Sequence, residues 1–90
     1  MMPWVYLLMD ERGRVYTGCA KNLRRRLQQH FSGCARSTKG WRLLRLVYAE
    51  ELPTLAEARK REAEIKRMKR EEKLKLAKKG IPEKALELCP

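Results

Sequence analysis

The first half of the chain alternates between short apolar runs and polar turns, a pattern typical of strands. Residues 4–9 are aromatic and aliphatic, a polar turn containing Gly13 follows, and residues 15–17 are again apolar or β-branched. This spacing predicts a β-hairpin. A second apolar run at residues 43–49 is bounded by acidic residues and a proline, and it predicts a third strand.

The rest of the chain has helical spacing. Asn22 is a good N-cap, and apolar residues at every fourth position after it predict a helix of about ten residues. Thr54 and Glu57 form a capping-box pattern, ahead of a helix that ends at about residues 66–68. Residues 70–79 predict a further helix, acidic in its first turn and basic in its last.

The predicted order of elements is β-β-α-β-α-α. Strands and helices interleave without strict alternation, so the pattern favours an α+β domain in which helices pack on a three-stranded sheet. A chain of 90 residues has room for one hydrophobic core only. We expect this domain to span residues 1–80 and residues 81–90 to form a C-terminal tail.

The charge of the chain indicates an anionic partner. Its formal net charge is +11, and residues 12–45 contain ten basic residues and no acidic one. An acid-free basic stretch of this kind is typical of a surface that binds nucleic-acid phosphates. The residues expected to contact nucleic acid are Arg14, Lys21, Arg24, Arg25, Arg36, Lys39 and Arg42.

Hydropathy and cysteine content indicate the compartment. No apolar run approaches the ~20 residues of a membrane helix, and residues 1–10 lack the basic start of a signal peptide. We therefore expect no membrane contact and a cytoplasmic location. Cys19, Cys34 and Cys89 are an odd number, which disfavours a disulfide framework. A zinc site at Cys19, His30 and Cys34 lacks a fourth ligand, so free thiols are the expectation.

Three polar residues fall on or beside predicted apolar helix faces. Arg26 and His30 border the stripe of the first helix, where a snorkelling arginine and a hydrogen-bonded helix-end histidine are the structural explanations. Glu62 falls in the apolar series of the capped helix, where an ionised carboxylate needs a partner. That partner is either Arg26, in a structural ion pair, or a hard cation such as Mg²⁺.

Tyr6 and Tyr16 lie on the two strands of the predicted hairpin. A three-residue loop with Gly13 at a positive φ would place both tyrosines on one face of the sheet, and a two-residue loop would place them on opposite faces. Strand tyrosines usually pack in a core or an interface, so the pair by itself does not indicate a site.

The spacing of these residues forms a set of motifs that covers residues 3–78. In chain order they are Trp4-Val5-Tyr6, Tyr16-Thr17-Gly18, Lys21-Asn22-Leu23, Arg26-Leu27, His30, Leu46-Val47-Tyr48, and Ala58 with Glu62. The set resembles the GIY-YIG nuclease domain, most closely that of the small single-domain bacterial GIY-YIG proteins. Cys19 departs from the lysine that the repair nucleases of this family carry beside the second motif.

The resemblance implies a metal-dependent phosphodiester hydrolase on an antiparallel sheet. By this resemblance, Tyr16 helps to activate the attacking water and Tyr6 orients water or phosphate. Arg26 stabilises charge on the phosphoryl oxygens, and His30 supports proton transfer. Glu62 holds one divalent cation, Mg²⁺ or Mn²⁺. Such a metal and a pre-placed guanidinium would supply the charge neutralisation that phosphodiester cleavage requires.

The expected activity is that of an endonuclease acting on DNA, in repair or in the processing of single-stranded or branched structures, with RNA as the other substrate class. The protein would act as a monomer or a weak dimer on its substrate, and the basic surface or a partner protein would supply specificity. The alternative is a non-catalytic basic module with the same fold, in which Arg26 and Glu62 form only a structural pair.

Overall fold

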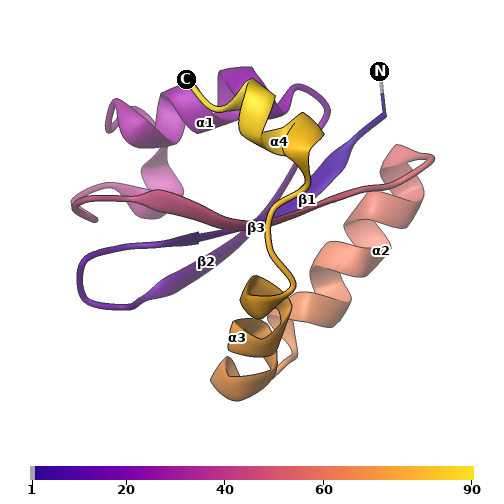
Figure 1. Ribbon diagram of the computed structural model, residues 1–90. Helices are drawn as coiled ribbons and strands as arrows, with labels where there is room; N and C mark the ends of the chain where they lie inside the picture. Colours follow the sequence, from indigo (N-terminus) through magenta and orange to yellow (C-terminus); the bar gives the residue numbers. More distant parts are fainter. Residues whose placement is uncertain (1) are drawn as a thin grey trace.

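The computed structural model describes residues 2–90 and confirms the predicted α+β class. Its elements are β1 (Trp4–Met9), β2 (Val15–Ala20), α1 (Leu23–Phe31), a 3₁₀ turn η1 (Arg36–Thr38), β3 (Arg45–Glu51), α2 (Leu55–Lys66), α3 (Arg70–Lys78) and α4 (Glu83–Leu88). The strands form one antiparallel three-stranded sheet in the order β2-β1-β3 (Figure 1). The hairpin therefore leaves β2 at an edge and β1 in the centre.

The hairpin loop has three residues and closes as expected. The backbone N–H of Asp10 donates to the carbonyl of Arg14 at 3.1 Å, and that of Gly13 donates to the carbonyl of Asp10 at 3.0 Å. Gly13 has a φ of 80°, which glycine adopts without steric cost. The Asp10 carboxylate accepts from Arg14 Nε at 2.7 Å. Burial by itself would raise the pKa of Asp10, but the hydrogen bonds that its carboxylate accepts lower that pKa.

The loop length decides the face on which the tyrosines lie. Tyr6 pairs with Gly18 and Leu8 pairs with Tyr16 across the hairpin, so Tyr6 and Tyr16 have the same parity. Both side chains point to the face that α1 covers. The structure thus confirms the shared face that the three-residue loop predicts.

The helices cover the two faces of the sheet in pairs (Figure 1): α1 and α4 lie on one face, and α2 and α3 lie on the other. The first face is filled by the buried cluster of Trp4, Tyr6, Leu8, Leu23, Leu27, Leu46, Ala49 and Ala85. The second is filled by Val5, Leu7, Tyr48, Ala58, Ile65 and Leu76. Because β1 is central, its alternating side chains contribute to both clusters.

Several boundaries differ from the sequence prediction, and β2 and β3 each run to later residues, Ala20 and Glu51. β3 begins at Arg45 rather than residue 43, because Leu43 has a φ of 54° and cannot join a strand ladder. Residues 81–90, expected to form a C-terminal tail, contain α4, which packs against α1 and buries Ala85 completely. None of the helices in residues 2–90 is long and apolar enough to span a bilayer.

Candidate functional site

A chain of buried polar contacts links α1 to β1 and to the turn η1. The hydroxyl of Tyr6 lies 2.8 Å from His30 Nε2, and His30 Nδ1 lies 2.8 Å from Thr38 Oγ1. Tyr6, His30 and Thr38 are each at most 2% exposed. The chain satisfies both ring nitrogens of a histidine that would otherwise be buried without partners.

Arg26, one turn before His30 on α1, lies against both tyrosines. Burial alone would lower the pKa of Arg26, but its contacts with the phenol groups of Tyr6 and Tyr16 raise it. Arg26 Nη1 donates to Gln29 Oε1 at 2.8 Å, which fixes the guanidinium along the helix. A fixed positive charge therefore lies beside the two phenols.

The surroundings determine the charge states of this cluster. Burial is the main cause that raises the pKa of Tyr6, so its phenol stays protonated. Burial, with the charge of Arg26, lowers the pKa of His30 from 6.5 to about 4, so the imidazole is neutral at pH 7. We call Arg26, Tyr6, Tyr16, His30 and Thr38 the polar cluster. At neutral pH its Arg26 is a cation, and the rings of Tyr6 and His30 are uncharged.

Tyr16 is the more accessible of the two phenols. Its ring centroid lies 6.3 Å from that of Tyr6 and 5.1 Å from that of His30. Tyr16 is half-buried, whereas Tyr6 has no exposed surface. A ligand that approaches these rings therefore contacts Tyr16 and Arg26 directly. The buried Tyr6 acts on the ligand only through those two residues.

Gly18 makes room for both tyrosines, a role that sequence reasoning missed. A Cβ atom at Gly18 would lie 2.4 Å from the Tyr6 hydroxyl and 2.9 Å from Tyr16 Cε2, closer than any real contact. The available signal was the cross-strand register, which places residue 18 directly opposite Tyr6. Thr38 was also missed, because a threonine in a polar loop carries no local signal for a distant histidine.

Glu62 comes from the helix on the other face of the sheet. Helix α2 packs against the edge strand β2, and the Glu62 side chain is 21% exposed. Burial is the main cause that raises the pKa of Tyr6 and of Cys19, and the charge of Glu62 adds to it in both cases. Glu62 thus borders the buried stripe rather than lying inside it, close to β2.

Arg26 and Glu62 do not form the structural ion pair that was the alternative to a site. Within residues 2–90, Glu62 Oε2 pairs with Lys66 Nζ at 3.1 Å, one turn along α2, and Arg26 is held by Gln29. The cation and the carboxylate approach β2 from opposite faces, each with a partner of its own on its own helix.

Comparisons with known proteins identify the family of this chain. The GIY-YIG catalytic domain matches residues 2–75, most of the chain. The chain belongs to the GIY-YIG family. This is a family of nucleases that bind nucleic acid and generally use a divalent metal ion.

Its relatives are small proteins of similar length. The chain is 42% identical over 78 residues to a UPF0213 protein of Staphylococcus saprophyticus, covering 86% of this chain and 95% of the relative. It is 44% identical over 77 residues to a UPF0213 protein of Syntrophus aciditrophicus, covering 83% and 88%. Among solved structures, the solution NMR structure of a UPF0213 protein from Bacillus halodurans matches with a TM-score of 0.59 and 35% identity, covering 96% and 94% of the two chains.

Among the site residues named above, Glu62 is the one carboxylate that could help to hold a hard cation. No group of three or more histidine, cysteine, aspartate or glutamate side chains gathers in residues 2–90, so a cage made only of protein ligands is absent from that range. Mg²⁺ commonly binds through one or two carboxylates together with phosphate oxygens and water. The partly exposed carboxylate of Glu62 meets that requirement, and no other site residue named above carries a negative charge.

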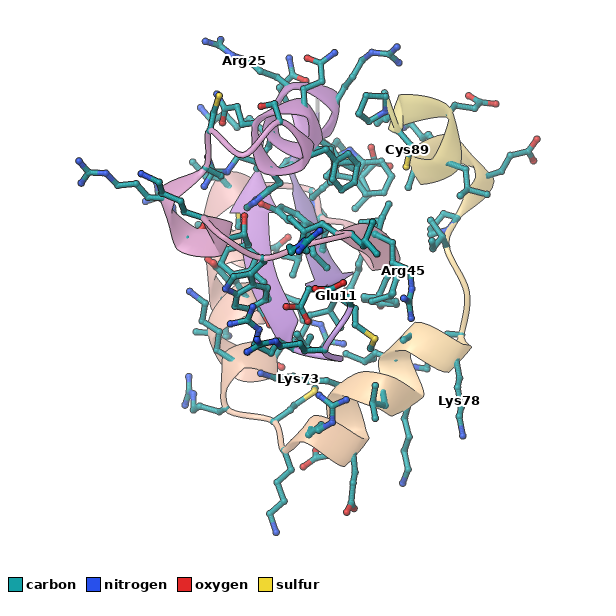
Figure 2. The ribbon with its side chains drawn as sticks, turned by 90° about the vertical axis from the view of Figure 1, so that its left-hand side faces the viewer. Glu11, Arg25, Arg45, Lys73, Lys78 and Cys89 are labelled. Carbon is teal, nitrogen blue, oxygen red and sulfur yellow. The ribbon has the colours of Figure 1, made fainter. Side chains whose placement is uncertain are left out.

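The basic residues expected to contact nucleic acid are all exposed: Arg14, Lys21, Arg24, Arg25, Arg36, Lys39 and Arg42. Some of them already have partners within the protein. Arg14 pairs with Asp10, Arg24 Nη1 donates to the carbonyl of Glu87 at 3.3 Å, and Arg42 lies 3.9 Å from Glu11. Figure 2 shows Arg25 at one end of the molecule and Lys73 of α3 at the other. Positive charge on the surface therefore extends well beyond Arg26 and the rings beside it.

The cysteines take no part in the polar cluster. Cys19, Cys34 and Cys89 are free thiols, and only Cys34 is exposed. The two ring nitrogens of His30 already face Tyr6 and Thr38, so neither is available to the zinc site considered from the sequence.

Proposed function

We propose that this GIY-YIG protein is a metal-dependent endonuclease that hydrolyses phosphodiester bonds in DNA, in repair or in the processing of single-stranded or branched structures. The observation that carries the proposal is that Arg26 meets Tyr6 and Tyr16 instead of pairing with Glu62. The protein acts in the cytoplasm as a monomer or a weak dimer on its substrate, with specificity from its basic surface or a partner protein.

Arg26 neutralises charge on the phosphoryl group. Hydrolysis of a phosphodiester builds negative charge on the non-bridging oxygens, and a cation already in position stabilises that charge without reorganisation. The guanidinium can serve here because Gln29 and the phenols fix its direction while its charge stays unpaired by any carboxylate in residues 2–90.

The hydrogen bonds of the cluster have one consistent direction. Arginine only donates, so in our proposal the oxygen of Tyr6 accepts from Arg26, and we assign the O–H of Tyr6 as the donor to His30 Nε2. A neutral imidazole that accepts at Nε2 carries its proton at Nδ1, which donates to Thr38 Oγ1. His30 therefore positions Tyr6 and prepares it to carry a proton inward.

Tyr16 faces the substrate. Tyr6 is buried and keeps its proton, whereas Tyr16 is half-buried and lies beside Arg26. The Tyr16 side chain is therefore the group that orients the attacking water, and as a phenolate it would accept the proton of that water.

Glu62 is the residue that would hold the Mg²⁺ or Mn²⁺ ion. A bound divalent cation supplies positive charge at the leaving and non-bridging oxygens. Displacing Lys66 from Glu62 costs little, because exposed i,i+4 pairs contribute about 0.5 kcal/mol or less.

The test compares Glu62→Gln with wild type on labelled single-stranded, duplex and branched DNA, each with Mg²⁺, with Mn²⁺ and with chelator. We expect cleavage by wild type only with metal, and a loss of about 100-fold or more in the variant. The matched control is Glu64→Gln, an exposed glutamate on the same helix that pairs with Arg61. Affinity for DNA should change by less than twofold in both variants.

Two outcomes would contradict this division of roles. Full cleavage by Glu62→Gln would show that Glu62 is not needed to hold the metal ion. A parallel loss of DNA binding would show that Glu62 supports the fold. Salt-sensitive binding without cleavage on every substrate would favour the non-catalytic module, in which Arg25→Ala should still weaken binding.

A further inference from the structure

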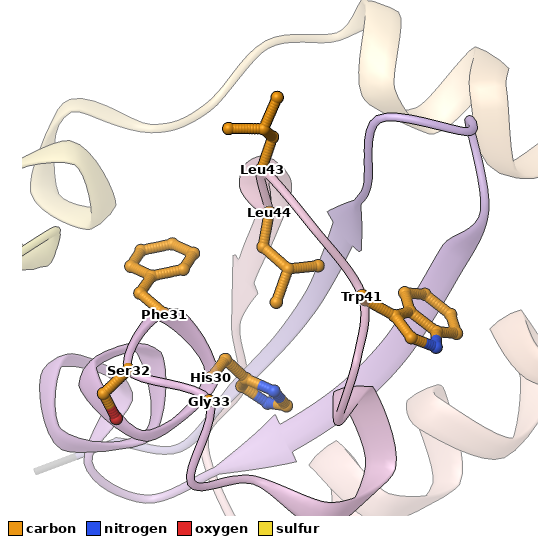
Figure 3. Close-up of a pocket in the computed structure, with 7 residues that line it drawn as sticks. All are labelled: His30, Phe31, Ser32, Gly33, Trp41, Leu43 and Leu44. Atoms are coloured by element: carbon orange, nitrogen blue, oxygen red, sulfur yellow. The ribbon is translucent and has the colours of Figure 1, made fainter.

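A pocket of about 360 Å³ opens beside the cluster and takes no part in the proposed hydrolysis. It lies between the C-terminal end of α1 and the segment that leads into β3, and Phe31, Leu44 and the ring of His30 surround it (Figure 3). Its volume falls within the range of small-molecule sites, which begins at about 300 Å³. Through His30, the pocket is one side chain away from Tyr6.

The rim of the pocket exposes large apolar side chains. Leu43 is 76% exposed and Phe31 is 39% exposed, on a molecule whose surface is otherwise strongly charged. Leu43 also has a φ of 54°, a left-handed conformation that a leucine rarely adopts. Strained backbone of this kind persists chiefly at functional sites, and here it holds a bulky apolar group in solvent with no gain in core packing.

The wall on the side of the hairpin is rigid. The Arg14 guanidinium lies 4.5 Å from the centroid of the Trp41 ring, and Tyr16 meets the same ring edge-on at 6.5 Å. Trp41 is therefore fixed between a cation and the accessible phenol of the site. The pocket and the site share this wall.

The charge around the pocket is suited to phosphate. Residues 30–44, which form most of its wall, contain Arg36, Lys39 and Arg42 and no acidic residue. All three basic side chains are exposed. Aromatic and apolar side chains beside exposed cations are the combination by which proteins hold single nucleic-acid strands, with bases on the rings and phosphates on the cations.

We infer that this pocket binds an unpaired nucleobase of the substrate strand, next to the phosphate that lies at Arg26. The inference rests on the proposed function and narrows its substrate class to single-stranded or locally unpaired nucleic acid. Bases inside a duplex are stacked and paired, so they enter such a pocket only after an unstacking cost.

The test measures binding in the presence of chelator, so that no cleavage occurs. The probes are a short fluorescent oligo(dT) and an abasic oligonucleotide of the same length, which carries the same phosphates without bases. We expect wild type to bind oligo(dT) about tenfold more tightly than the abasic strand, because base stacking contributes only to the former.

Leu43→Gly removes the rim side chain and relieves the positive φ, so the variant should fold at least as well as wild type. We expect its affinity for oligo(dT) to fall about fivefold and its affinity for the abasic strand to remain unchanged. Leu86→Ala is the matched control, since Leu86 is an exposed leucine on α4, 53% exposed and outside the pocket lining. Phe31→Ala should behave as Leu43→Gly does.

The outcomes separate the two proposals. Equal affinity for both probes in wild type, or an equal loss on both probes in Leu43→Gly, would overturn the nucleobase pocket and leave nucleic-acid binding intact. No binding of either probe would overturn the proposed function and, with it, this inference. Metal-dependent cleavage is measured separately, so its failure does not affect the binding result.

Discussion

The two faces of the sheet are covered by similar pairs of helices but differ in their chemistry. Under α2 and α3 the buried side chains are almost all apolar, and the charged contact between Glu50 and Arg61 stays at the rim. Under α1 and α4 the core also buries a chain of hydrogen-bonded polar groups that reaches Thr38. The face under α2 and α3 supplies packing, with Glu62 at its border, and the face under α1 and α4 combines packing with the buried polar groups of the candidate site.

This difference shows how a small domain accommodates a polar site. β1 is buried along almost its whole length, and its alternation sends Val5 and Leu7 to one face and Tyr6 and Leu8 to the other. Every buried polar atom on the site face must find a partner, because an unsatisfied one costs about 1–3 kcal/mol. Changes to the buried apolar side chains under α2 and α3 should therefore affect stability alone, and changes on the face under α1 and α4 should affect stability and activity together.

The largest expected change in stability is on the apolar face. Ile65→Ala removes a side chain with no exposed surface and should lower the free energy of unfolding by about 2–5 kcal/mol in urea denaturation. Cleavage per folded molecule, measured at low temperature, should stay within twofold of wild type. A loss of cleavage beyond the unfolded fraction would show that the two faces are not independent.

The next effect is a pH dependence that belongs to the site face. The folded-state pKa of His30 is about 4, so the unfolded chain gains a proton as pH falls through 6.5 while the folded protein does not. Because His30 is neutral in the folded protein, it contributes about 3 kcal/mol to the free energy of unfolding above pH 6.5. This contribution is lost progressively as the pH falls to 4.

Urea denaturation of wild type and His30→Gln from pH 7 down to pH 4.5 measures this effect. Wild type should lose stability faster than the variant throughout that window. Asp10 provides the internal contrast: its pKa is lowered, so its contribution is present above about pH 4 and is lost below that range. Parallel curves for the two proteins would exclude His30 as the source.

Gly18→Ala should affect both properties of the site face. The added methyl group displaces Tyr6 and Tyr16, so the free energy of unfolding should fall by about 1–3 kcal/mol and cleavage by at least tenfold. The control is Gly40→Ala, where the Cβ has open space and only the positive φ carries a cost of about 1–2 kcal/mol. If both variants keep full cleavage, the placement of the tyrosines does not matter for activity.

The smallest expected effect is at the rim of the apolar face. Glu50 accepts hydrogen bonds from Tyr48 at 2.9 Å and from Arg61 at 3.0 Å. Because this network is partly exposed, Glu50→Gln should cost about 1 kcal/mol or less, and the difference should shrink at high salt. Cleavage should not change, and a measurable loss would extend the site on this face beyond Glu62.

The features that the sequence predicted best are local ones. Asn22 and Thr54 accept the predicted capping hydrogen bonds from the backbone N–H groups of Arg25 and Glu57, because a cap involves only residues within one turn. The start of β3 was predicted too early. Apolar character at Leu43 is typical of a strand, and nothing local shows that this residue turns outward at a positive φ beside a pocket.

The sequence alone determined the fold class, the charge and the faces from which Arg26 and His30 approach the sheet, because these follow from helical and strand periodicity. Only the tertiary structure decided that Tyr6 meets His30 and that Glu62 pairs with Lys66 rather than Arg26. Periodicity fixes the direction in which a side chain leaves its own element. Which side chains meet across more than twenty residues depends on how the elements pack, and packing is a property of the whole chain.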